Sequence, residues 1–237
     1  MYLSGACPGT VLVQTALGYR SAYYALQGSL LGGLAWAGLV RPYVKQTTGG
    51  ISQKTGVTLS QALGISHSAA VLGFGAFCAS VIATTLLRFP ANPDAKISPV
   101  AGGLLIGLVQ LGSALSTKTL VGVSGSYEEA GDWIFWPLRG TDTKHPSSSS
   151  IQFALGIAGG AWLTARGIPF LAEGAPAEVS ALSALLGGFI MALGSRVAGG
   201  CTSGHGISGA SLLSVSSLVT IGSIFAGGAA VAQLLTI

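Results

Sequence analysis

Two cysteines of this chain stand in glycine-rich segments that interrupt apolar sequence. Cys7 lies in SGACPGT (residues 4–10) and Cys201 lies in GSRVAGGCTSGHGISG (residues 194–209), and both follow the pattern Gly-x-Cys. Glycine runs of this kind do not propagate a helix comfortably, so we expect each cysteine beside a helix start. A thiol in that position donates a weak hydrogen bond to a passing ligand without adding charge.

Two basic residues stand beside such breaks. Arg196 ends an apolar run shortly before Cys201, and Lys118 precedes the break LVGVSGS (120–126). No carboxylate is close to Arg196 in the sequence, and a charge at membrane depth usually faces a cavity or a partner. Both side chains are therefore expected to be available to an anion that comes from elsewhere, with snorkelling to the membrane interface as the alternative.

The glycines of the longer segment add to this expected anion site. We expect Gly200, Gly204 and Gly206 to keep the backbone close to a ligand. Half-helices that begin after the cysteine motifs would aim free N–H groups and a positive dipole end at it. The long apolar runs contain no Asp or Glu, which cation transport would require. The pattern favours an anion over a cation.

The same residues allow two other chemistries. Cys201 and His205 are spaced for a thiolate–imidazolium pair if the segment is helical, and a helix N-terminus lowers the pKa of a thiol. Otherwise His205 would orient the loop or the ligand. Zinc bound by Cys7, Cys201 and His205 is poorly supported because neither cysteine has a close Cys partner. We expect neither a metal nor a cofactor.

Composition indicates that lipid is the main solvent of the chain. Of 237 residues, 50% are hydrophobic and only 8% are charged, whereas soluble domains carry about 25% charged residues. A membrane helix needs about 20 apolar residues. We therefore predict an all-α, polytopic helical membrane protein. Its expected spans are 21–40, 66–87, 98–115, 151–171, 180–197 and 211–235.

Charge and cysteine content exclude other classes. The net charge of +4 includes no dense basic run, so nucleic-acid binding is not expected. An odd number of cysteines does not form a disulfide framework, and Cys78, in an apolar run, is expected to be a packing residue. Residues 127–150 contain most of the acidic residues and are expected to form a loop on the solvent side or at the membrane interface.

Short internal similarities indicate two pseudo-symmetric halves within one membrane domain. GGLLIGL resembles GGFIMAL, GVSG resembles GISG, and GACPG resembles GGCTSG. Broken segments in corresponding positions of two halves are typical of a transporter site. The expected half-repeats are residues 1–97, which would lack their N-terminal helix, and residues 98–237.

The two cysteine motifs, together with LSTKTLVGVSGSYEEAGDW (115–133), resemble the YeeE/YedE family of sulfur-transport membrane proteins over most of the chain. The resemblance implies pseudo-symmetric halves and short re-entrant half-helices that meet at a central constriction. It also implies that Cys7 and Cys201 pass thiosulfate or a related anion along through weak S–H hydrogen bonds. A further family cysteine lies near the N-terminus, in a region that this chain is expected to lack, and Cys78 does not match it.

We therefore predict a permease of the plasma (inner) membrane that takes up thiosulfate or a related sulfur-containing anion. The alternative is a membrane-embedded thiol enzyme that handles sulfur or selenium with a Cys201 thiolate and His205. A third alternative is a scaffold subunit whose cysteines only pack. Besides the anion and the bilayer, a cytosolic sulfur-carrier protein is a candidate partner.

Overall fold

The computed structural model describes residues 1–47, 57–89, 95–117, 122–138, 145–172 and 179–235, and the structural statements below concern these ranges. Helices dominate, and the β pairing in these ranges is one isolated bridge between Thr58 and Ser214, which confirms the all-α class. The α-helices are α1 (Pro8–Ala16), α2 (Arg20–Ala35), α3 (Arg41–Thr47), α4 (Leu59–Leu63), α5 (His67–Arg88), α6 (Pro99–Thr117), α7 (Ser124–Phe135), α8 (Ser149–Gly167), α9 (Pro169–Ala172), α10 (Ala181–Val197) and α11 (Val215–Leu235). Two π-helices accompany them, η1 (Trp36–Val40) and η2 (Gly204–Gly209).

Each expected membrane span overlaps a helix, although 151–171 is divided between α8 and α9 and 211–235 begins before α11. By length and composition, α5, α6 and α11 are long and apolar enough to cross a bilayer. The other expected spans correspond to α2 with η1, to α8 and to α10. The predicted loop 127–150 is wrong in its first part, because α7 extends through Phe135.

Helices α2 and α10 cross with their backbones almost in contact. A Cβ added to Gly28 would lie 2.0 Å from the carbonyl oxygen of Leu185, and one added to Gly188 would lie 2.2 Å from that of Ala25. Small residues at such crossings let membrane helices approach closely. Because no side chain fits at these two positions, their glycines determine the crossing of α2 and α10.

Helix α7 packs against α2 in the same manner. A Cβ on Gly33 would lie 2.1 Å from the carbonyl oxygen of Tyr127, and one on Gly131 would lie 2.9 Å from the carbonyl oxygen of Gly33. These contacts hold α7 beside the crossing of α2 and α10, where its first turn reaches the Cys201 segment.

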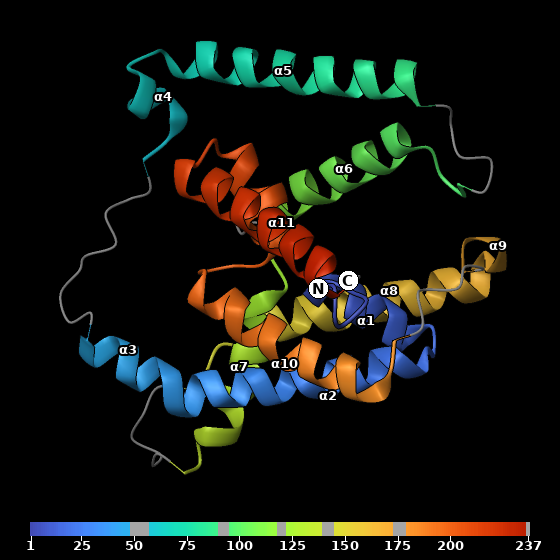
Figure 1. The fold of residues 1–237 in the computed structure, drawn as a ribbon, viewed down its shortest axis with the longest axis vertical. Helices are drawn as coiled ribbons and strands as arrows, with labels where there is room; N and C mark the ends of the chain where they lie inside the picture. Colours follow the sequence, from blue (N-terminus) through green and yellow to red (C-terminus); the bar gives the residue numbers. More distant parts are fainter. Residues whose placement is uncertain (48–56, 90–94, 118–121, 139–144, 173–178, 236–237) are drawn as a thin grey trace.

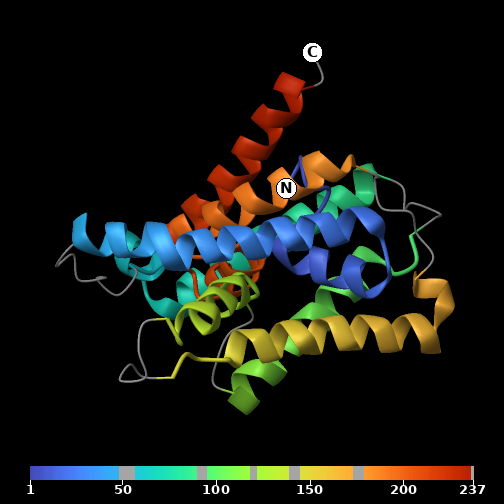
Figure 2. The same ribbon diagram turned by 90° about the horizontal axis from the view of Figure 1, so that it is seen from below.

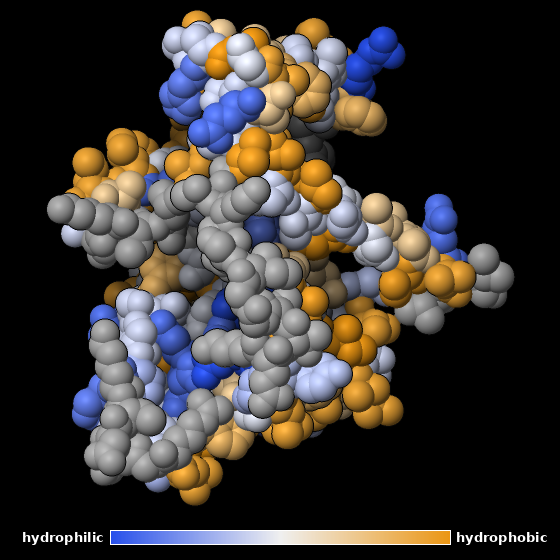
Figure 3. All heavy atoms as spheres, turned by 90° about the vertical axis from the view of Figure 1, so that its left-hand side faces the viewer, coloured by the Kyte–Doolittle hydropathy of each residue, from blue (hydrophilic) through white to orange (hydrophobic). Residues whose placement is uncertain are grey.

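The remaining long helices are far less enclosed. Figure 1 shows α5 and α6 apart from the group formed by α1, α2, α7, α8 and α10, and Figure 2 shows α11 extending away from it. On α5, the exposed fractions are 73% for Leu72 and 85% for Leu87. Figure 3 shows apolar patches on one face with hydrophilic residues between them. The exposed apolar side chains and the three apolar helices indicate an integral membrane protein.

Candidate functional site

Both Gly-x-Cys segments turn through a glycine with left-handed backbone. The dihedral φ is 65° at Gly5 and 78° at Gly199. A residue with a Cβ pays roughly 1–2 kcal/mol in this conformation. Glycine therefore allows the chain to change direction two residues before each cysteine.

Each cysteine begins a short helix, and its sulfur bonds to the first turn of that helix. Cys7 is the N-cap of α1, and the backbone N–H of Thr10 donates to its Sγ at 3.4 Å. Cys201 stands directly before the helical segment 202–211, which contains η2. A Cβ on Gly204 would lie 4.0 Å from the Cys201 sulfur. In both segments the third residue after the cysteine lies against the sulfur, as at an N-cap.

The first turn of α7 completes the surroundings of Cys201. This cysteine is 3% exposed, and its Sγ lies 3.0 Å from Oγ of Ser203. Ser124, the first residue of α7, also lies beside the sulfur. A Cβ on Gly122 would lie 4.0 Å from the Cα of Gly204. The glycine-bearing break before α7 thus meets the helix that Cys201 begins.

Tyr127 links α7 to the Cys7 segment. Its side chain is 2% exposed, and its hydroxyl donates to the carbonyl oxygen of Pro8 at 2.8 Å. A Cβ on Gly9 of α1 would also lie 3.6 Å from Cγ2 of Val123, the residue directly before α7. The N-terminal turns of α1, of α7 and of segment 202–211 therefore converge around the two cysteines. Sequence reasoning missed Tyr127 because it placed this residue in a loop.

His205 braces the Cys201 segment rather than the thiol. Its Nε2 lies 3.1 Å from the carbonyl oxygen of Ala198, which can only accept, and its Nδ1 lies 3.0 Å from Oγ of Ser217. Nε2 therefore carries the proton, and Nδ1 accepts from the serine hydroxyl. Since both ring nitrogens are engaged, the expected alternative pair with Cys201 is not formed. The ring packs on Gly200, where a Cβ would lie 2.9 Å from Nε2.

The other two expected glycines lie on different sides of segment 202–211. A Cβ on Gly204 would meet the Cys201 sulfur at 4.0 Å, an ordinary contact distance. A Cβ on Gly206 would lie 3.3 Å from Cδ1 of Ile221 in α11. Gly204 thus faces the thiol, while Gly206 allows the segment to pack closely on α11.

Arg196 has an acidic partner, contrary to expectation. Its Nη2 forms an ion pair with Oε2 of Glu128, and the side chains are 21% and 16% exposed. Oε1 of the same carboxylate lies 2.9 Å from Nη1 of Arg41. The partner was hidden because it comes from α7, which sequence reasoning assigned to a loop. Lys118, the other expected cation, lies outside the described residues.

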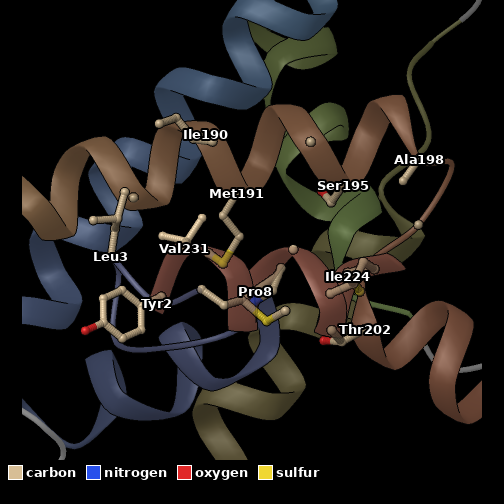
Figure 4. Close-up of a pocket in the computed structure, with 17 residues that line it drawn as sticks. Tyr2, Leu3, Pro8, Ile190, Met191, Ser195, Ala198, Thr202, Ile224 and Val231 are labelled. Atoms are coloured by element: carbon tan, nitrogen blue, oxygen red, sulfur yellow. The ribbon is translucent and has the colours of Figure 1, made fainter. Parts of the chain in front are cut away.

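An apolar cavity of about 320 Å³ adjoins Cys201. In Figure 4, Met191 of α10 and Val231 of α11 project into it from opposite sides, and Thr202 lies near Ile224. Cys201 and Pro8 are among its lining residues, whereas Cys7 is not. Among the described residues, no group of His, Cys, Asp and Glu is arranged for a metal ion, so the zinc alternative gains no support.

Comparison with known proteins adds a family. A family model described as sulphur transport matches residues 1–230 of the 237-residue chain. No curated protein matches the chain closely enough to add a named relative. The matched range includes both Gly-x-Cys segments and all of α7. The chain therefore belongs to the sulphur-transport family, YeeE/YedE, whose role is that of a membrane transporter for sulfur.

Proposed function

We propose that the protein is a permease that takes up thiosulfate or a related sulfur-containing anion past the thiols of Cys7 and Cys201. The observation that carries this proposal is the convergence of the N-terminal turns of α1, α7 and segment 202–211 around the two cysteines. Helix N-termini present free N–H groups and a positive dipole end. The three helix N-termini together favour an anion at the thiols. Because they carry only partial charges, they bind the anion less tightly than a charged side chain would.

The chemistry of thiosulfate suits this arrangement. Its oxygens accept strong hydrogen bonds from N–H donors, and its soft terminal sulfur accepts the weaker S–H bond of a neutral thiol. The hydroxyls of Thr10 and Ser203 lie 2.9 Å and 3.0 Å from the sulfur atoms of Cys7 and Cys201. In each pair either atom can be the donor. The relay requires protonated thiols, because only an S–H group can donate to the anion.

The positive potential at this site comes chiefly from helix ends and backbone. Arg196 is paired with Glu128, so the carboxylate partly cancels the positive potential that Arg196 produces at the thiols. We propose that Lys118 contributes further positive potential. Gly200 and Gly204 let the backbone lie close to His205 and to the Cys201 sulfur.

The wider organisation of the permease is part of the same proposal. The matching backbone of the two Gly-x-Cys segments supports pseudo-symmetric halves, 1–97 and 98–237, whose short helices re-enter the membrane and meet at a constriction. We place the permease in the inner membrane. A cytosolic sulfur carrier would accept the anion after passage.

Uptake into reconstituted vesicles tests the proposal. Radiolabelled thiosulfate is expected to accumulate unchanged with the wild-type protein. Cys201→Ala and Cys7→Ala are each expected to reduce the initial rate at least about tenfold, because each removes an S–H donor to a charged ligand. Cys78→Ala is the matched control and should leave the rate unchanged, since its thiol lies within α5.

Other outcomes favour the alternatives. Release of sulfite with a persulfide left on Cys201 would indicate a thiol enzyme. The engaged ring of His205 speaks against that chemistry, because both of its nitrogens bond to groups other than the thiol. Normal uptake by the double variant Cys7→Ala/Cys201→Ala would contradict the relay and leave the cysteines as packing residues.

A further inference from the structure

A cluster of four charged side chains lies where the ends of α10 and η1 meet α7. Glu128 bridges two arginines, with Oε2 on Nη2 of Arg196 and Oε1 on Nη1 of Arg41. Asp132 holds Arg41 through both of its Nη atoms. The two guanidinium charges are thus balanced by two carboxylates.

We propose that Arg196 and Arg41 form a second oxyanion-binding position, which the Glu128 carboxylate occupies until an incoming anion displaces it. This inference rests on the proposed function, since it adds a step to the passage of the same anion. The Glu128 carboxylate places one oxygen against each guanidinium. A small tetrahedral oxyanion also has two oxygens on one central atom and can make the same two contacts. Glu128 therefore acts as an internal competitor for the transported anion.

The guanidinium of Arg196 retains a donor that Glu128 does not use. Its Nε is buried and has no hydrogen-bond partner within the described part of the chain. A buried donor without a partner costs about 1–3 kcal/mol. An oxyanion with more acceptor oxygens than a carboxylate could accept from Nε and Nη2 together, a fork geometry that arginine favours.

Asp132 and Glu128 have different parts in the cluster. Asp132 engages both Nη atoms of Arg41 and fixes that side chain. Glu128 makes one bond to each arginine, so one displacement frees a donor on both. The side chains of Arg41, Arg196 and Glu128 are 22%, 21% and 16% exposed, and partial burial strengthens their interactions relative to the surface.

The cluster lies next to the thiols along α7 and along α10. The residues before α7 lie against Gly204 of the segment that Cys201 begins, Tyr127 donates to the carbonyl oxygen of Pro8 beside Cys7, and Glu128 is the next residue. Arg196 stands in the last turn of α10, directly ahead of the Gly199 turn that leads to Cys201. An anion that leaves the thiols therefore has the two arginines as its neighbouring binding position. Competition by Glu128 keeps binding there weak enough for release, which permeation requires.

Binding of sulfate and thiosulfate to the purified full-length chain tests the inference. The dissociation constant would be measured by calorimetry in detergent. Glu128→Gln keeps the shape of the side chain and removes its charge, so it is expected to tighten binding about tenfold. The gain should vanish in Glu128→Gln/Arg196→Gln, because the unpaired guanidinium is then gone.

Glu129→Gln is the matched control, because it removes the same charge from the neighbouring position of the same helix. Its carboxylate accepts from the backbone N–H of Ile151 at 3.0 Å and from Ser149, so binding should not change. If Glu128→Gln does not fold, Glu128→Asp serves, since it keeps the charge and is too short to bridge both arginines. It is expected to tighten binding several-fold.

Two results would overturn the inference: unchanged affinity in both Glu128 variants, or an equal gain in Glu129→Gln. Wild-type uptake separates this failure from that of the proposed function. If the wild-type protein takes up thiosulfate but neither Glu128 variant binds anions more tightly, only the second binding position is rejected. If Glu128→Gln binds anions more tightly in a way that depends on Arg196, but the wild-type protein takes up no thiosulfate, the second position is supported and the permease is rejected.

Discussion

The Cys7 and Cys201 segments share a backbone and differ in their surroundings. Each has a left-handed glycine two residues before the cysteine and a short helix that the cysteine begins. Cys7 is partly exposed and is not among the residues that line the cavity, whereas Cys201 is 3% exposed and lines it. The local path is thus repeated, while the environment of the thiol is not.

The difference arises from elements far away in the sequence. Around Cys201, Ser124 of α7 contacts the sulfur and His205 ties the segment to Ser217 of α11. The Cys7 sulfur bonds instead to Thr10 of its own helix. Glycine placement therefore encodes the turn before each thiol, and tertiary packing decides how enclosed the thiol becomes.

The two segments are expected to differ most in the effect of a substitution at the residue between the glycine and the cysteine, which is Gly200 in one and Ala6 in the other. Gly200→Ala places a Cβ 2.9 Å from Nε2 of His205, so the ring must move and loses its bonds to Ala198 and Ser217. We expect a loss of about 2–3 kcal/mol in the free energy of unfolding and at least a tenfold loss of uptake. Denaturant titration in detergent and vesicle uptake measure the two effects.

The equivalent position before Cys7 is Ala6, which is already a side-chain-bearing residue and is buried. Ala6→Gly is expected to cost only about 1 kcal/mol, through backbone entropy. On a His205→Ala background, Gly200→Ala should add little, because the clashing ring is absent. Equal costs for Gly200→Ala and Ala6→Gly would contradict the role assigned to His205.

The sequence predicted the long helices because their hydrophobicity is local. It also predicted both cysteines beside helix starts, since glycine and turn residues mark those points. It missed α7, whose run SYEEAGDW has acidic residues and no apolar period. That helix is stabilised by contacts that no local pattern encodes, such as the approach of Tyr127 to Gly33 and the bonds of Glu128 to two arginines.

The same limit applies to the glycines of the packed helices. Gly28 and Gly188 are ordinary for membrane helices by composition, yet each meets a carbonyl oxygen of the opposite helix. A glycine in the sequence indicates that another helix can approach closely at that position. Only the packed structure identifies which helix does so.

Thiol reactivity tests the difference in burial, with a smaller expected effect. In detergent, N-ethylmaleimide is expected to label Cys7 about tenfold faster than Cys201, because the sulfur of Cys201 is enclosed and that of Cys7 is partly exposed. Peptide mass spectrometry over time gives both rates from one sample in a Cys78→Ser background. Similar rates would show that the two thiols are equally accessible, and the contrast in burial would then fail.

The smallest effect tests the shared backbone itself. Gly5→Ala and Gly199→Ala should each lower the free energy of unfolding by roughly 1–2 kcal/mol, because both glycines have positive φ. A Cβ on Gly199 meets no atom within 4 Å, so the cost of Gly199→Ala is conformational rather than steric.

Gly73→Ala is the control. Gly73 stands inside α5 with open space around it, and alanine there should stabilise the helix by up to about 1 kcal/mol. Costs that differ by more than about 1 kcal/mol between Gly5 and Gly199 would show that the two turns are not equivalent, since a conformational penalty depends on φ and not on the neighbours of the residue.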